Sequence, residues 1–381
     1  MQTMHPSIML GSYVWAQDRL PADEFSLRLD ELRAAMARHG FAAVLVYGDA
    51  REHAALAYVS NFIPRMRWGL ALVPRAGEPR LLCSMSTRDL PAMRTMTWIA
   101  DVQSGWELDK VLDPWLARLE GEGPMTFGTI GFDIMAPVLH QALRKSFGER
   151  FALQQADDVF NIPAARKRSR ELTMLRASCK VLNAAAKVFA ENWRSSHTPE
   201  TAALAAERTA RSLAAQDVRT LVSLDGGRTL VPFAGRFEQK PGPLVGYLAV
   251  KVMGYWADAF VTEEAAPAAA RKTEAALDAL IANARPGARG GELFLCATAA
   301  LAPAKLHPVL GGSVGHGIGL SLNEGAEFCA GADVALEADG VYALQAGIAD
   351  GEAGHALLSA VVRVTATGAE VLARSPTQAS P

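Results

Sequence analysis

The segment PADEFSLRLDELRAAMARHGFAAVLVYGD, residues 21–49, joins a helical pattern directly to a strand pattern. Apolar residues recur at helical spacing from Phe25 to Met36, and His39-Gly40 ends that pattern. The apolar run AAVLVYG follows, as expected of a buried strand. A helix followed at once by a strand predicts a mixed fold of the α/β (α+β) class.

The region around this segment repeats the mixture. GLALVPRAGEPRLLC predicts a hairpin that turns at Ala76-Gly77, and FGTIGFD predicts a further strand. The polar, proline-broken stretch NIPAARKRSR (161–170) then separates this region from a long helical pattern. We therefore predict an N-terminal domain over residues 1–163 and a C-terminal domain over residues 164–381.

The second domain combines helices with two strand pairs. Helical patterns cover 171–193 and 269–284, and another begins after Thr198, which we expect to cap it. LVGYLAVKV and YWADAFVT predict one hairpin, and VYALQAGI with ALLSAVVRVTATGAEVL predicts the last strands. The paired glycines of GGELFLC and DGGRTL lack the Lys-Ser/Thr of a phosphate-binding loop and predict turns. The expected architecture is a sheet covered by helices on one side.

The composition is that of a large globular protein. Half of the 381 residues are hydrophobic, and the net charge is −2 with no block of like charge. Neither nucleic acid nor a membrane surface is therefore an expected partner. Four cysteines without a CxxC pair predict buried thiols in a reducing compartment. The N-terminus lacks a signal-peptide pattern and no apolar run reaches the ~20 residues that span a bilayer, so we expect a cytoplasmic location.

Five segments in chain order resemble one known family. They are RLDELRAAMARHGFAAVLVYG, RKRSRELTMLRASCKV, GYWADAFVT, GHGIGL and VTATGAEVL. Together they resemble the family of creatinase, aminopeptidase P and methionine aminopeptidase over essentially the full chain. The resemblance implies a creatinase-type N-terminal α/β domain followed by a C-terminal pita-bread domain. It also implies a homodimer.

The resemblance further implies where a metal site would lie. Metal-dependent members hold two divalent ions on two Asp, one His and two Glu, a set whose carboxylates balance the charge of the cations. Asp258 and His316 match the second Asp and the His. The other three positions carry neutral residues, namely Tyr247, Gln345 and either Ser359 or Ala360. Because one carboxylate and one imidazole cannot balance two divalent cations, we expect no metal and no other cofactor.

Two proton-handling histidines of the family are also replaced. Phe233 in VPFAG stands at the first and Asn323 at the second, whereas Glu324 keeps the Glu that follows. We treat all three as candidate substrate-binding positions, with a structural role as the alternative for Glu324. Creatinase shows that this fold can work without metal, but the missing imidazole and the amide of Gln345 argue against creatine as the substrate.

The retained pair has two interpretations. Asp258 could orient His316 and stabilise its imidazolium, which would make His316 a general acid or base near neutral pH; alternatively, the pair is a relic that forms a buried hydrogen bond. Gln345 and Asn323 could donate to an oxyanion or a substrate carboxylate, or they could fill polar space in a decayed site. Tyr247 could donate its hydroxyl to substrate or serve packing.

Arg65 lies in NFIPRMRWG, a loop that in creatinase-like dimers reaches toward the pocket of the partner subunit. A guanidinium fork suits a substrate carboxylate. Solvated surface is the alternative, and it is favoured for Arg67. His307 and His355 match no family ligand and have no predicted role.

These observations lead to one hypothesis and two alternatives. The hypothesis is a metal-independent, creatinase-like hydrolase or lyase that acts on a C–N bond of a small polar molecule, with His316 as acid/base and Asp258 as its partner. The first alternative is a catalytically inactive peptidase-like domain used for ligand or protein binding. The second is a mononuclear metal hydrolase that recruits Glu324 or Glu264.

Overall fold

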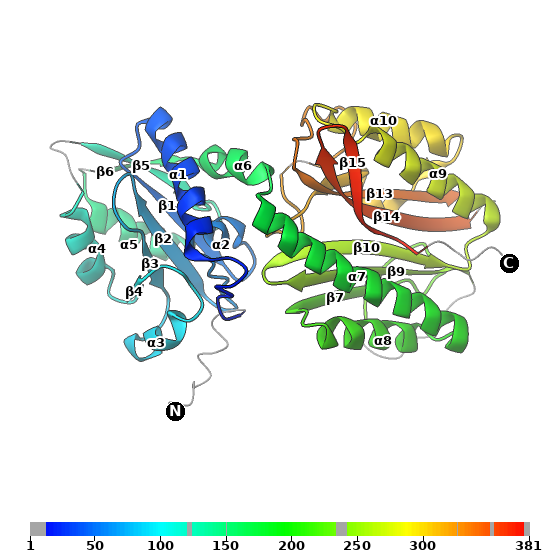
Figure 1. The fold of residues 1–381 in the computed structure, drawn as a ribbon, viewed down its shortest axis with the longest axis horizontal. Coiled ribbons are helices and arrows are strands. Elements are labelled where there is room, and N and C mark those ends of the chain that lie inside the picture. Colours follow the sequence, from blue (N-terminus) through cyan, green and yellow to red (C-terminus); the bar gives the residue numbers. More distant parts are fainter. Residues whose placement is uncertain are drawn as a thin grey trace. The chain divides into compact units, whose positions relative to one another are not determined.

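The computed structural model describes residues 13–119, 124–149, 151–233, 242–325, 327–350 and 354–376. The chain divides into two compact units, Met1–Ala164 and Ala165–Pro381. Both combine helices with sheets (Figure 1), so the predicted mixed class is confirmed. Within the described ranges, no helix is long and apolar enough to cross a membrane.

The first unit is built on a six-stranded mixed sheet. Its helices are α1 (Ala22–His39), α2 (Ala54–Ser60), α3 (Leu90–Met93), α4 (Leu108–Leu116), α5 (Pro137–Phe147) and α6 (Asp157–Ala165). Its strands are β1 (Ala43–Asp49), β2 (Trp68–Pro74), β3 (Arg80–Cys83), β4 (Asp101–Ser104), β5 (Met125–Ile130) and β6 (Phe151–Gln155). They lie in the order β4-β3-β2-β1-β5-β6, and the predicted antiparallel hairpin of β2 and β3 is confirmed.

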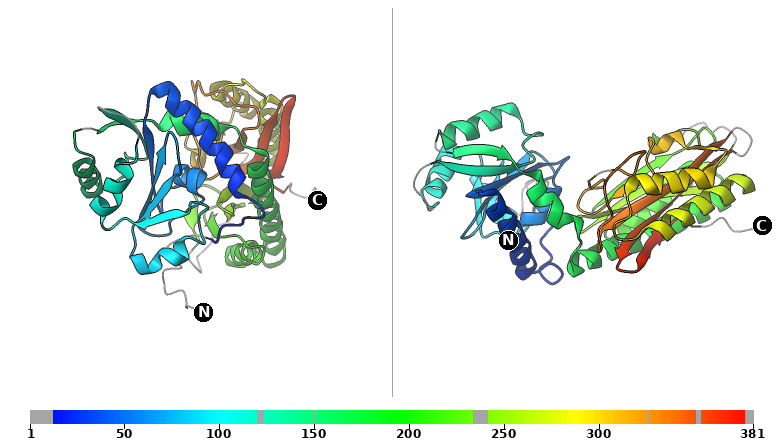
Figure 2. Two further views of the ribbon diagram at one scale, coloured as in Figure 1. Left: turned by 60° about the vertical axis from the view of Figure 1, so that its left-hand side comes forward. Right: turned by 90° about the horizontal axis from the view of Figure 1, so that it is seen from above.

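Helix α1 forms as its apolar spacing predicts. Phe25, Leu32 and Met36 are buried, and the helix ends where Gly40 adopts a left-handed conformation with φ of 72°. Helices α4 and α5 pack on the other face of the sheet, where Trp115 and Phe147 contact the ring of Phe127 edge-on. Figure 2 shows α1 and the α4–α5 pair on opposite faces of this sheet. Helices on both faces make this unit a three-layered α/β structure.

The second unit contains two sheets. Its helices are α7 (Ser169–Ser196), α8 (Pro199–Ser212), α9 (Pro267–Asn283) and α10 (Gly290–Leu301). Strands β7 (Asp217–Val222), β8 (Val231–Pro232), β9 (Leu244–Val252) and β10 (Tyr255–Glu263) form one sheet in the order β10-β9-β7-β8. The other sheet contains β11 (Lys305–Leu306), β12 (Gly315–Gly317), β13 (Val341–Asp350), β14 (Gly354–Thr365) and β15 (Gly368–Arg374), with β12 and β11 both paired to β13.

The two sheets of the second unit meet along β10 and β14. The Phe260 amide donates to Ser359 Oγ at 2.9 Å, and the Thr262 hydroxyl donates to the Leu357 carbonyl at 2.7 Å. Helix α7 covers β9 and β10 (Figure 1), while α9 and α10 cover the second sheet. The unit therefore has helices outside and two joined sheets between them, rather than the single covered sheet that we expected.

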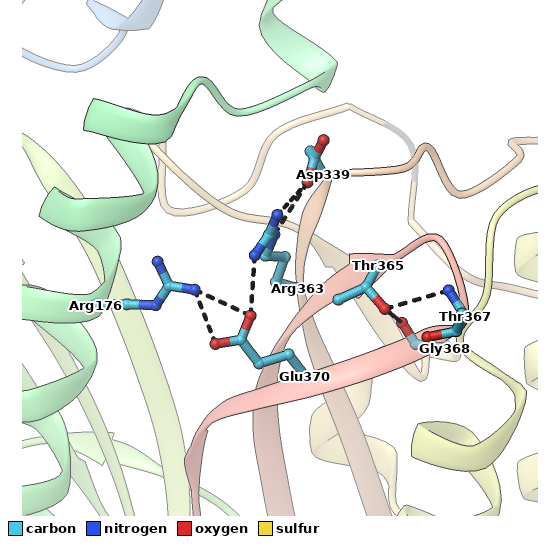
Figure 3. Close-up of polar contacts among 7 residues, drawn as sticks. All are labelled: Arg176, Asp339, Arg363, Thr365, Thr367, Gly368 and Glu370. Atoms are coloured by element: carbon cyan, nitrogen blue, oxygen red, sulfur yellow. Dashed lines mark hydrogen bonds and ion pairs between the residues drawn. The ribbon is translucent and has the colours of Figure 1, made fainter.

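A charged network ties α7 to β14 and β15 (Figure 3). Glu370 accepts from Arg176 at 2.8 Å and from Arg363 at 3.2 Å, and Arg363 also donates to Asp339 at 2.6 Å. The guanidinium groups hold the pKa of Glu370 below its usual value, chiefly through the hydrogen bond from Arg176. The network thus fixes the closing VTATGAEVL hairpin to the long helix.

Three sequence expectations differ from the structure. GGELFLC begins helix α10 rather than a turn, because its paired glycines let the first turn approach the chain at Ala332, where the Gly291 amide donates to the carbonyl. Thr198 is the N-cap residue of α8, but its side chain makes no cap bond and donates instead to Thr201. Cys329 is exposed, although Cys83 and Cys179 are buried as expected.

Candidate active site

Asp258 lies in the middle of β10 with a fully buried side chain. Tyr255, three positions earlier on β10, contacts Glu171 of α7. Side chains alternate between the two faces of a strand, so Asp258 points to the face away from α7. Asp258 Oδ2 accepts a hydrogen bond of 2.8 Å from the Tyr247 hydroxyl on β9. Asp258 Oδ1 is buried and has no hydrogen-bond partner among the described residues. The carboxylate is therefore held firmly at one oxygen and has unused acceptor capacity at the other.

His316 reaches the same point from the other sheet. It lies on β12 opposite Ala343, and its Nε2 is 3.7 Å from Asp258 Oδ2. Its Nδ1 is 2.9 Å from the Gly317 carbonyl, which can only accept, so Nδ1 carries the proton of the neutral ring. The lone pair of Nε2 then faces the Gln345 amide nitrogen at 3.3 Å. A proton taken up at Nε2 would create an ion pair with Asp258.

The electrostatics of the pair follow from its burial. Desolvation raises the pKa of the Asp258 carboxyl, and His316 and the Tyr247 hydroxyl oppose that rise. Burial, followed by the Asp258 charge, raises the pKa of Tyr247 well above its usual value. Tyr247 is thus a neutral hydrogen-bond donor whose hydroxyl is committed to Asp258.

Gln345 and Ser359 are direct partners across β13 and β14. Gln345 is 8% exposed and contacts His316, so the structure brings it to the pair. Ser359 is buried, and its hydroxyl accepts a hydrogen bond from the Phe260 amide. Ser359, one of the two residues matched to the last family carboxylate, therefore helps to join the two sheets.

Glu324 and Asn323 lie at the end of the glycine-rich segment. Glu324 accepts from Lys167 at 2.6 Å and from the Ser321 amide at 3.2 Å, and Lys167 is almost fully buried. Asn323 is exposed, and its amide donates to Glu327 at 3.1 Å. Glu324 therefore anchors this segment structurally, and the predicted role of Asn323 toward substrate has no geometric support.

Phe233 and Arg65 complete the predicted set. Phe233 is half-buried directly after β8, and its amide donates to the Thr220 carbonyl at 3.1 Å. An apolar ring cannot replace the imidazole that the family has at this position. Arg65 is exposed in the first unit, where Arg67 stacks over Trp106 at 5.6 Å. The role of Arg65 toward a partner subunit stays a prediction.

A second histidine pair was given no role by the sequence. His307 is buried, and its Nε2 donates to the Gly227 carbonyl at 2.8 Å. His355 Nδ1 lies 3.2 Å from the same Nε2. Burial lowers the pKa of His307 to about 4, so this ring is neutral near pH 7. The two residues are 48 positions apart in the chain, and no local pattern signals their contact.

A family model described as metallopeptidase family M24 matches residues 174–366, which include Asp258, His316 and Gln345. The chain belongs to this family. Among curated proteins, none matches it.

Solved structures with the M24 fold resemble nearly the whole chain. The prolidase from Pyrococcus horikoshii has a TM-score of 0.75 and 16% identity, with 92% of this chain and 99% of that chain covered. The X-Pro aminopeptidase from Thermotoga maritima has a TM-score of 0.75 and 17% identity, with 92% and 98% covered. The N-terminal domain of a FACT complex subunit from Cicer arietinum has a TM-score of 0.69 and 15% identity, with 92% and 96% covered. The predicted pita-bread fold with its N-terminal domain is confirmed.

The M24 description implies metal ions, and the residues present do not fit them. Among the described residues, no group of three or more His, Cys, Asp or Glu could hold a metal ion. The Tyr247 hydroxyl donates a hydrogen bond to Asp258, and Gln345 is a neutral amide. The Ser359 hydroxyl accepts a hydrogen bond from the Phe260 backbone amide. A dinuclear site needs carboxylates at these three positions to balance its charge.

Proposed function

We propose that this M24 member is a metal-independent hydrolase or lyase that acts on a C–N bond of a small polar molecule. The observation that supports it is the geometry of His316, whose Nδ1 is committed to a backbone carbonyl while Nε2 faces Asp258 at 3.7 Å. An imidazole oriented in this way has one basic nitrogen, Nε2, which can take up a proton when the Gln345 amide is displaced. Reaction chemistry of this kind needs a positioned proton acceptor that later becomes a donor.

In this proposal His316 Nε2 takes a proton from water or from the substrate, and the resulting imidazolium is stabilised by Asp258. The same proton is then delivered to the leaving nitrogen. Tyr247 keeps Asp258 Oδ2 in place. Gln345 sits at Nε2 and could donate its amide to a substrate oxygen when substrate displaces it.

A mononuclear metal hydrolase has less support. It would recruit Glu324 or Glu264 beside Asp258 and His316. The Glu324 carboxylate is occupied by the buried Lys167, and the Glu264 carboxylate lies 3.3 Å from His197. Neither carboxylate is placed with the pair.

We expect purified protein to hold well below one equivalent of Mn, Co, Fe or Zn after dialysis, because the donors at positions 247, 345 and 359 are neutral. Elemental analysis measures this directly. Turnover should be screened with amides, amidines and guanidino compounds in the presence of a chelator, with release of ammonia or amine as the readout. A full equivalent of metal that is lost in Asp258→Ala, or turnover that the chelator abolishes, would contradict the proposal.

An inactive binding domain is the alternative with a specific observation in its favour. The FACT subunit domain shares this fold, and three of five family ligand positions here are neutral. If no compound in the screen is turned over, this alternative is the better account.

The cytoplasm remains our proposed location, since four free cysteines suit a reducing compartment.

We also propose that the protein is a homodimer in which Arg65 serves the site of the partner subunit. The support is the creatinase-type resemblance of the first domain and the exposure of Arg65. Sedimentation velocity at micromolar concentration should show a dimer of the 381-residue chain. A monomer at every concentration tested would remove Arg65 from the site.

A further inference from the structure

Arg219 on β7 shares a sheet row with Asp258. The register pairs Arg219 with Ala249 on β9, and Ala249 with Asp258 on β10. Residues that pair directly across neighbouring strands point to the same face of a sheet. Arg219 and Asp258 therefore share one face, about 10 Å apart at their Cα atoms because two strand spacings separate them. Only the small side chain of Ala249 lies between them in the row.

This shared face is the one that His316 approaches. The opposite face of the sheet packs on α7, where a side chain at Gly246 would meet the ring of Phe189. Tyr247, the next residue on β9, points the other way and binds Asp258. Arg219 thus belongs to the side of the sheet that carries the candidate site.

The Arg219 side chain is held in place without being neutralised. Its guanidinium lies over the ring of Trp256 at 4.7 Å, and Trp256 is almost fully buried on β10. Arg219 is exposed, and over the described part of the chain no carboxylate forms an ion pair with it. Burial and Asp258 raise the pKa of Tyr247, and Arg219 is the cation that opposes them. A stacked guanidinium is ordered in advance, so it loses less entropy when it binds an anion.

This face of the sheet therefore carries two complementary groups in one row of the register. Asp258 Oδ1 is a buried acceptor without a described partner and calls for an N–H donor. Arg219 presents a fork of donors that matches an oxyanion.

We infer that Arg219 binds an oxyanion, a carboxylate or a phosphate, at one end of a ligand whose N–H group meets Asp258 at the other end. This rests on the proposed function for the chemistry at His316, but anion binding requires no turnover. It narrows the substrate class to small molecules that carry both an N–H group and an anionic group a few bonds away.

The test measures anion binding to the full chain by thermal shift at constant ionic strength. Malonate and inorganic phosphate are the anionic probes, and malonamide is the neutral match for malonate. Wild type should be stabilised by at least one anion and not by malonamide; a preference for malonate or phosphate identifies the kind of oxyanion. Arg219→Gln should weaken the apparent affinity by roughly 10- to 100-fold, since hydrogen bonds to charged groups contribute about 1.5–3 kcal/mol. Arg219→Lys keeps the positive charge but loses the forked pair of donors, so its apparent affinity should lie between those of wild type and Arg219→Gln.

Arg208→Gln is the matched control, because Arg208 is an exposed arginine on α8. It should bind the anion as wild type does. If wild type shows no shift with either anion, or if Arg219→Gln responds as wild type does, the inference is overturned. A catalytically silent protein would still bind the anion through Arg219, so failure of the proposed function and failure of this inference can be told apart.

Discussion

Replacing His316 with Gln should reduce turnover of the substrate found in the screen by about 10²–10⁴-fold, the range that general acid–base catalysis contributes. Glutamine keeps a polar group near Gln345 but cannot carry a proton between substrate atoms. The free energy of unfolding should change by less than about 1 kcal/mol, because the glutamine amide is polar and can replace the hydrogen bond with Gln345. Steady-state kinetics and urea unfolding measure the two quantities separately.

Asp258→Asn is the companion variant. It should also slow turnover, since it removes the charge that stabilises the imidazolium. Burial raises the folded-state pKa of Asp258, so the carboxyl stabilises the fold most at low pH, and that contribution is lost as pH rises through the folded pKa. Asparagine should therefore not lower stability at neutral pH. If both variants turn over substrate normally, His316 is not the acid/base; if both mainly lower the melting temperature and no compound is turned over, the pair is structural.

Glu324→Gln should lower the free energy of unfolding by about 1.5–3 kcal/mol, because it weakens a charge-assisted hydrogen bond from an almost fully buried ammonium group. Lys167 is 3% exposed, and its ammonium lies 2.6 Å from Glu324 Oε2. The loss should appear in chemical unfolding followed by circular dichroism. The loss in the free energy of unfolding should be larger than any loss in the free energy of substrate binding.

Glu327→Gln is the control for this prediction. Glu327 is exposed and accepts a hydrogen bond of 3.1 Å from Asn323. It should change stability by less than about 0.5 kcal/mol. Equal effects of the two substitutions would show that the Lys167 contact is not what holds the segment, and would return Glu324 to the candidate ligands.

Local patterns predicted most of the second unit. The hairpin of β9 and β10, helix α9 and the closing strands lie within a few residues of their expected positions, because each has a clear apolar period and the hairpins turn at glycines. Helix α10 was missed because its first two residues are glycines, which are poor helix formers. Glycine is needed at these positions because the backbone of Ala332 lies close to Gly291. Ala332 is about forty residues away in the chain, so the local sequence gives no sign of this contact.

The sequence by itself determined the fold family, because the family depends on residue types at motif positions, and the same positions predict that three metal ligands are replaced. It also singled out Asp258 and His316. Only the tertiary structure decided which neighbours serve them. Tyr247 turned out to be bound to Asp258, Gln345 to lie against His316, and Glu324 to pair with Lys167. The contact of Tyr247 with Asp258 joins two strands of one hairpin, whereas the other two contacts join segments 29 and 157 residues apart. The physical reason is that hydrogen bonds and ion pairs depend on distance in space, which motif spacing does not encode.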